Sequence, residues 1–171
     1  AGYFASVGKR VAIADCDPQQ SCADWLSIRP ESAATIKSAK VKAGKIDVPR
    51  RTEFLIIDTP AALHGQKLAN YAKVSQTIVM PMMPSQLDIR AAERFVTELF
   101  SLRKLINRKI KVATVANRVR EDTIVAAKLE NYLDKIKLPA GHKLPFITML
   151  RATQNYIKAS EHGLSIFEFA P

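Results

Sequence analysis

The sequence predicts an α/β fold, in which a mainly parallel sheet carries helices on both faces. Short apolar runs alternate along the chain with segments of helical spacing, and two of these runs, Val11–Asp15 and Phe54–Asp58, end in an aspartate. A continuously apolar run indicates a strand that is buried on both faces, as in parallel sheets. Repeated strand–helix units favour right-handed crossovers between such strands. The chain has 171 residues, 47% of them hydrophobic, which is enough for one domain with its own core.

The first half of the chain divides at glycine and proline. Gly8 ends an initial helical segment, and Pro30 follows a second one. The stretch 31–51 mixes Ala, Lys and Ser, so we expect mostly loop there, with one strand near 35–39. The expected elements are helices over 1–7, 21–28 and 66–73 and strands over 11–14 and 54–57.

The second half begins with a third apolar run over 76–80, which Pro81 is expected to end. Ser85 and Asp88 have the spacing of a capping box, so a helix should begin there. Its apolar positions are Leu87, Ala91, Phe95, Leu99, Leu102 and Ile106. Further on we expect strands over 111–116 and 144–147, with Asn117–Arg118 just past the first, and helices over 122–136 and 152–162.

The charge balance is strongly basic. The chain has 26 Lys and Arg against 16 Asp and Glu, a formal net charge of +10. Such a charge favours polyanions, nucleic acid above all. No acidic residue occurs between Glu98 and Glu121. The same window contains the basic residues Arg103, Lys104, Arg108, Lys109, Lys111 and Arg118. This window is a candidate surface for DNA phosphates, and the alternative is a solvated basic face.

Cysteine, histidine and hydropathy exclude other classes of protein. Cys16 and Cys22 lack a CxxC spacing and the three histidines are scattered, which argues against a zinc site or a disulfide framework. No apolar stretch approaches the roughly 20 residues that span a bilayer. We therefore expect a cytoplasmic protein with no membrane partner.

Three aspartates lie at or just after the carboxyl ends of the two predicted strands. Asp15 and Asp17 come at and just after the end of the first strand, and Asp58 ends the second. Parallel strands present their carboxyl ends at one edge of the sheet, where α/β folds bind ligands. Carboxylates at this edge suit Mg²⁺ and a phosphorylated ligand. The alternative is that strand-end aspartates cap turns or helices.

Five ordered stretches resemble the ParA group of partition ATPases, within the deviant Walker A class that also holds the MinD proteins. The resemblance implies a P-loop NTPase-like fold. Phe54–Ala61 resembles a Walker B strand, and Ala116–Val119 resembles an asparagine motif that contacts adenine. The five stretches are Gly2–Pro30, Phe54–Ala61, Val79–Asp88, Ala116–Val119 and Ala159–Glu168.

The resemblance also implies roles for individual residues. Asp17, with Asp15 supporting the same turn, would be catalytic and would orient the attacking water, and Asp58 would hold Mg²⁺ through a water molecule. Asn117, with Arg118 beside it, would bind adenine, and Gln19 would move with the nucleotide state. Family members form ATP-dependent homodimers, bind DNA nonspecifically and release it when a ParB-like partner stimulates hydrolysis. A nucleoid-associated location in the cytoplasm follows.

One departure from the family pattern is large, since the signature Lys-Gly-Gly-x-Gly-Lys-Thr is absent. The pairs Gly8-Lys9 and Gly44-Lys45 lack the other Walker A residues. We expect a fragment that lacks the phosphate-loop strand and the final helix, and that binds ATP poorly as it stands. The alternatives are a relative that has lost ATP binding, a non-catalytic DNA-binding or adaptor protein, and a MinD-like or cobyrinate-synthesis enzyme. The sequence leaves the cargo and the partner open.

Overall fold

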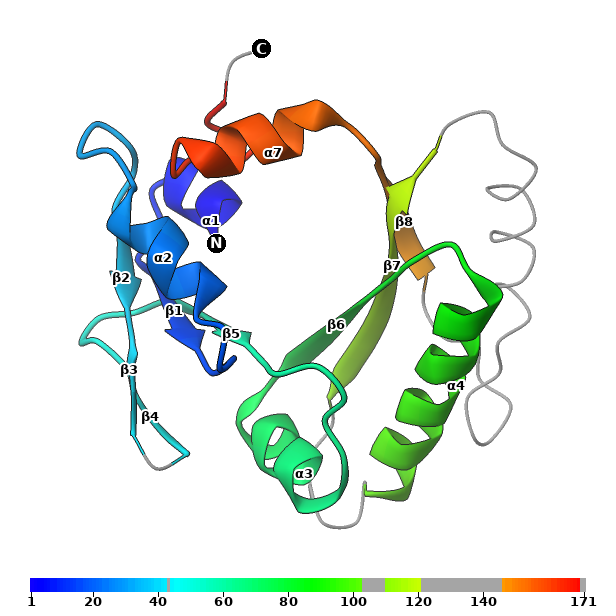
Figure 1. Cartoon of the computed structure of the whole chain (residues 1–171). Helices are drawn as coiled ribbons and strands as arrows, with labels where there is room; N and C mark the ends of the chain where they lie inside the picture. The colour runs from blue at the N-terminus through cyan, green and yellow to red at the C-terminus, as the bar shows by residue number, and fades with distance from the viewer. Residues whose placement is uncertain (43, 103–109, 121–145, 170–171) are drawn as a thin grey trace. The chain divides into compact units, whose positions relative to one another are not determined.

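A computed structural model describes residues 1–42, 44–102, 110–120 and 146–169. It contains two compact units, Ala1–Ala62 with Thr153–Pro171, and Leu63–Ala152. Each unit has a parallel sheet and helices, so the predicted α/β class is confirmed (Figure 1). The expectation of one domain stays a prediction. The expected helix over 122–136 lies outside the described residues. Within the described part of the chain, no helix is long and apolar enough to cross a membrane.

The first unit is built on a buried central strand, β1 (Val11–Asp15). It pairs in parallel with β2 (Ile36–Ser38) on one side and with β5 (Phe54–Asp58) on the other. Val11 and Ile13 pack against Ala5 and Ile36, and Trp25 and Phe54 pack around them. The helices of this unit are α1 (Gly2–Ser6), α2 (Ser21–Ser27) and α7 (Gln154–Glu161). The strands and helices predicted for these segments are confirmed.

The expectation of mostly loop over 31–51, with one strand near 35–39, missed two short strands. Besides β2, this stretch forms an antiparallel hairpin of β3 (Lys40–Lys42) and β4 (Lys45–Asp47). Val41 and Ile46 pack against a core cluster that contains Ala12 and Ala14, while the lysines on either side of them are exposed. Each strand has only three residues, and lysine is depleted in strands. The alternation was therefore too short to identify from the sequence.

The second unit has the parallel strand order β6 (Thr77–Met82), β7 (Lys111–Val119) and β8 (Phe146–Arg151). Its described helices are α3 (Gly65–Val74) and α4 (Gln86–Ser101). Pro81 does not end β6 as expected, because it lies opposite Val115 within the ladder. Proline is tolerated in an edge strand, and β6 is an edge strand among the described residues.

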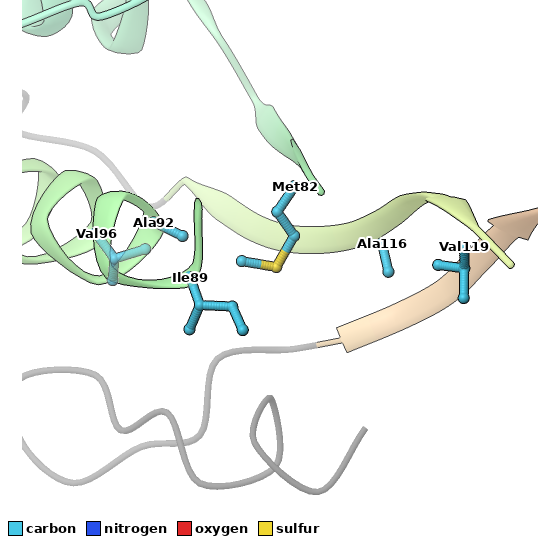
Figure 2. Packing of buried hydrophobic residues seen from close by; sticks show 6 residues of the cluster. All are labelled: Met82, Ile89, Ala92, Val96, Ala116 and Val119. Atoms are coloured by element: carbon cyan, nitrogen blue, oxygen red, sulfur yellow. The ribbon is translucent and has the colours of Figure 1, made fainter. Parts of the chain in front are cut away.

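The core of the second unit lies between α4 and the sheet. Figure 2 shows Ile89, Ala92 and Val96 of α4 together with Met82 of β6 and residues of β7. Ser85 caps α4 as predicted, because its side chain accepts the Asp88 N–H at 3.2 Å. The predicted apolar face is wrong at its start, since Leu87 is 79% exposed and Ile89 is buried.

The end of β7 also differs from the prediction. The strand runs on to Val119 through Asn117 and Arg118, and its register with β8 shifts between Ala116 and Val119. Arg118 has a φ of 54°, in the left-handed region. A bulge of this kind lets a strand continue past a local kink, which an apolar pattern does not reveal.

Candidate functional site

The two strand-end aspartates of the first unit lie side by side. Asp15 of β1 and Asp58 of β5 are directly paired in the parallel register, at the carboxyl ends of both strands. The pairing continues one residue further, because the Cys16 N–H donates to the Asp58 carbonyl at 2.9 Å. Both aspartates are half-buried. The predicted meeting of two carboxylates at one sheet edge is therefore present.

Asp15 holds the loop that follows it. Its Oδ1 accepts the Asp17 N–H at 3.1 Å, and its Oδ2 accepts the Ala23 N–H at 2.9 Å. Ala23 lies in the first turn of α2, so this carboxylate joins the end of β1 to the start of the helix. These contacts are those of a residue that supports a turn. A catalytic role for Asp15 stays a prediction.

Asp17 lies at the centre of that turn. Its Oδ1 accepts the Gln19 N–H at 2.9 Å, and its carbonyl accepts the Gln20 N–H at 3.0 Å. Gln20 has a φ of 54° and is the N-cap of α2. Asp17 is half-buried, whereas Gln19 is exposed. The backbone thus fixes the position of Asp17 next to the paired strand ends.

Cys22 contacts Asp58 and was missed by the sequence analysis, which used the cysteines only to exclude zinc and disulfides. Its thiol donates to Asp58 Oδ2, with a sulfur–oxygen distance of 3.1 Å. Burial, with the hydrogen bond to Asp58 and the negative charge of that carboxylate, raises the pKa of Cys22 to about 12. The thiol is therefore protonated at neutral pH and orients the carboxylate. The sequence gave no signal for this pair, because Cys22 and Asp58 are 36 residues apart.

The donor set at this edge fits one kind of metal ion. Among the described residues no group of three or more His, Cys, Asp or Glu side chains could enclose a metal. Mg²⁺ that travels with a nucleotide needs only one or two carboxylates, because phosphates and water complete its octahedron. Asp58 and Asp17 can supply that number, so these residues fit Mg²⁺ bound together with a nucleotide.

The predicted adenine contact belongs to the second unit. Asn117 is half-buried, and its Oδ1 accepts the N–H of Arg118 at 3.0 Å. Arg118 is exposed. Of the predicted DNA-binding residues, Lys111 begins β7 and is exposed. Arg103, Lys104, Arg108 and Lys109 lie outside the described residues.

A second feature that the sequence analysis missed anchors α2 at its far end. The side chains of Arg29 and Glu168 form a salt bridge and are only 6% and 10% exposed. Trp25 Nε1 donates to the Leu164 carbonyl at 3.3 Å, and the Arg29 guanidinium lies over the Trp25 ring at 5.1 Å. The segment that ends at Glu168 therefore contacts the same helix that begins beside Asp15.

Comparison with known proteins gives relatives over nearly the whole chain, although no protein-family model matches. The chain is 24% identical over 166 residues to "Maintenance of carboxysome distribution protein A" of Halothiobacillus neapolitanus, covering 93% of this chain and 74% of that protein. It is also 24% identical to the protein of that name from Gloeobacter kilaueensis, covering 94% of this chain and 72% of the relative.

Solved structures share the fold. A Borrelia burgdorferi putative plasmid partition protein bound to AMPPNP matches with a TM-score of 0.66 and 14% identity, over 99% of this chain and 83% of that one. An ATP complex of a Cyanothece McdA variant matches with a TM-score of 0.71 and 14% identity, over 98% of this chain and 81% of that one. A chain of the Aquifex aeolicus MinC:MinD cell division complex matches with a TM-score of 0.66 and 12% identity, over 96% of this chain and 78% of that one.

The parallel sheets and the matching structures define a P-loop NTPase-like α/β fold. The sequence relatives are carboxysome distribution proteins, and the plasmid partition, McdA and MinC:MinD structures share the fold, so the predicted resemblance to the ParA and MinD group is confirmed.

Proposed function

We propose that the protein is a ParA-like ATPase that acts in plasmid or chromosome partitioning through ATP-dependent dimerisation and nonspecific DNA binding. The observation that carries the proposal is the pairing of Asp15 with Asp58 at one sheet edge, with Asp17 held beside them in a hydrogen-bonded turn. The relatives support it, because their names describe carboxysome distribution and plasmid partition, and two matching structures hold AMPPNP or ATP.

In this proposal each residue at the edge has one task. Mg²⁺ bound with ATP would supply neutralisation of the phosphate charge. Asp58 holds the ion, and the Cys22 thiol keeps the carboxylate oriented. Asp17 orients the attacking water, while Asp15 fixes the turn through the Asp17 N–H. Gln19, just beyond the turn, responds to the nucleotide state. The adenine contact stays assigned to Asn117, with Arg118 beside it, in the second unit.

Backbone amides and a lysine normally hold the β- and γ-phosphates of ATP. The 171 residues contain no Gly-x₄-Gly-Lys-Ser/Thr run. The proposal therefore concerns the protein that the complete reading frame encodes, and the 171 residues by themselves should bind ATP weakly. Reading the coding sequence around this segment for Lys-Gly-Gly-x-Gly-Lys-Thr is the first check.

The decisive experiment measures ATP hydrolysis by the protein from the complete reading frame, with and without duplex DNA and a ParB-like partner. Asp17→Ala should lower kcat by about 10²-fold or more, because general-base or water-orienting groups contribute that much. Asp24→Asn, an exposed acid on α2 just after the Asp17 turn, is the matched control and should leave kcat unchanged. Normal hydrolysis by Asp17→Ala would contradict the assigned role.

The missing phosphate loop favours a second candidate, a non-catalytic DNA-binding or adaptor protein on the same fold. The two differ in one measurement. A wild-type protein that retains duplex DNA but never hydrolyses ATP supports the second candidate. Slow hydrolysis that DNA and a partner accelerate, with sedimentation as a dimer only when ATP is present, supports the ATPase.

A further inference from the structure

A basic cavity lies at the opposite end of the strands from the paired aspartates. It has a volume of about 420 Å³ and adjoins Val11, the first residue of β1. Its charged lining residues are Lys9, Arg10, Lys37, Arg50 and Arg51, all of them exposed. The cavity is therefore distinct from the carboxylate edge, because β1 separates Val11 from Asp15.

One carboxylate offsets part of this charge. Glu53 lies 4.0 Å from Lys9 Nζ and 3.4 Å from an Arg10 guanidinium nitrogen, and it also accepts the Arg10 N–H at 3.0 Å. Within the described part of the chain, Lys37, Arg50 and Arg51 form no salt bridge. Five cations thus face one anion, and the excess positive charge has no partner in the described protein.

The hairpin β3–β4 follows β2 along the chain and carries three further lysines. Lys40, Lys42 and Lys45 are exposed, whereas Val41 and Ile46 between them pack inward. In the antiparallel register Lys42 lies directly opposite Lys45, whereas Lys40 lies opposite the acidic Asp47. Like charges at opposed positions destabilise a hairpin. A bound polyanion would remove that repulsion.

We propose that this basic edge, defined as the cavity lysines and arginines together with Lys40, Lys42 and Lys45, binds the phosphate backbone of duplex DNA. The inference rests on the DNA step of the proposed function and gives that step a surface. It is independent of the predicted window from Arg103 to Arg118, most of which lies outside the described residues.

The layout of the charges favours a long polyanion over a small one. From Lys37 to Lys42 the chain runs along β2 and β3 for about 17 Å, at ~3.3 Å per residue. That length matches about five base pairs at ~3.4 Å each. A small anion would need several buried donors that converge on one point, whereas these side chains are exposed and spread out. No aromatic residue belongs to the edge, so phosphate contact without sequence selectivity is expected.

The test uses the full-length protein and fluorescence anisotropy of a labelled mixed-sequence duplex over a salt titration. Lys42→Gln/Lys45→Gln and Lys37→Gln/Arg50→Gln each remove two charges from the edge. Lys67→Gln/Lys158→Gln removes two exposed charges elsewhere and is the matched control. If both residues of an edge pair contact phosphates, the slope of log K against log salt falls by about 1.8 and binding at about 0.1 M salt weakens on the order of 50-fold.

Lys42→Arg/Lys45→Arg keeps the charge and should bind as the wild type does, and unchanged Trp25 fluorescence shows that a variant is folded. Edge variants that bind like the control overturn the inference, and ATP hydrolysis measured on the same samples decides the proposed function separately. The inference is also overturned if pyrophosphate displaces the duplex at constant ionic strength, or if anionic vesicles but not duplex DNA are retained.

Discussion

The buried salt bridge between Arg29 and Glu168 should carry a large part of the stability of the first unit. Besides Arg29, Glu168 accepts the N–H and the hydroxyl of Ser165, at 3.0 and 2.7 Å. Arg29 donates to the carbonyls of Ala34 and Gly163 at 2.7 to 3.0 Å. Glu168→Gln would leave the guanidinium buried beside neutral oxygens only. Removing one partner of such a pair costs about 3–5 kcal/mol.

That cost is large against the about 5–15 kcal/mol that separates folded from unfolded proteins. Urea unfolding followed by tryptophan fluorescence measures it directly, because Trp25 is the only tryptophan and lies against Arg29. Glu161→Gln, an exposed acid on α7, is the control and should change the free energy of unfolding by no more than about 0.5 kcal/mol. Equal midpoints for the two variants would refute the reasoning.

The same residue predicts a pH dependence. Burial by itself raises the pKa of Glu168, but the hydrogen bonds from Arg29 and Ser165 outweigh it, so the pKa lies below its ordinary value of 4.5. A carboxyl whose pKa is lowered by folding stabilises the folded state above its unfolded pKa, and this contribution is lost as pH falls through the folded pKa. The wild type should therefore lose stability below about pH 4.5. Glu168→Gln should lose less over the same range, since it lacks this carboxyl.

Two further substitutions test other parts of the fold. Gly163 has a φ of +65°, and a Cβ there would lie 2.6 Å from the Arg29 Cα, whereas Gly8 has a φ of +79° and nothing within 4 Å. Gly163→Ala should therefore lower the free energy of unfolding in urea by about 1–3 kcal/mol more than Gly8→Ala does. The reason is that the added methyl group would clash with the backbone of Arg29, which has no room to move. Ile89 is 6% exposed and Leu87 is 79% exposed. Ile89→Ala should destabilise by about 2–5 kcal/mol, and Leu87→Ala should have almost no effect on the thermal midpoint.

Two strands, β1 and β5, follow from the sequence because their burial is uniform along their length. β1 and β5 are continuously apolar and end in aspartates, so both the strands and their shared edge could be predicted. The start of α4 followed from the Ser85 cap, a contact between residues three apart. Where the burial of a segment alternates over only three residues, as in β3 and β4, the pattern carries too little information.

The contacts that complete the site are long-range, which is why they escaped prediction. Glu168 and Arg29 are 139 residues apart, and no local rule pairs them. Similarly, Cys22 meets Asp58 only because β1 and β5 are neighbours in the sheet. Propensity and spacing describe single segments, whereas these pairs depend on how the segments pack.

Two of the motifs that indicated the ParA resemblance come from opposite ends of the chain, and α2 joins them. The helix begins where Asp15 binds the Ala23 N–H and ends next to Arg29, which Glu168 holds. Its seven residues span only about 10 Å at ~1.5 Å each. A short helix fixed at both ends cannot shift at one end without straining the other. If the protein is the proposed ATPase, Glu168→Gln in the full-length protein should lower kcat for ATP hydrolysis as well as stability, because α2 links the Glu168 segment to the Asp15 and Asp17 turn. Steady-state hydrolysis without urea, where the variant stays folded, measures it, and an unchanged kcat would contradict this coupling.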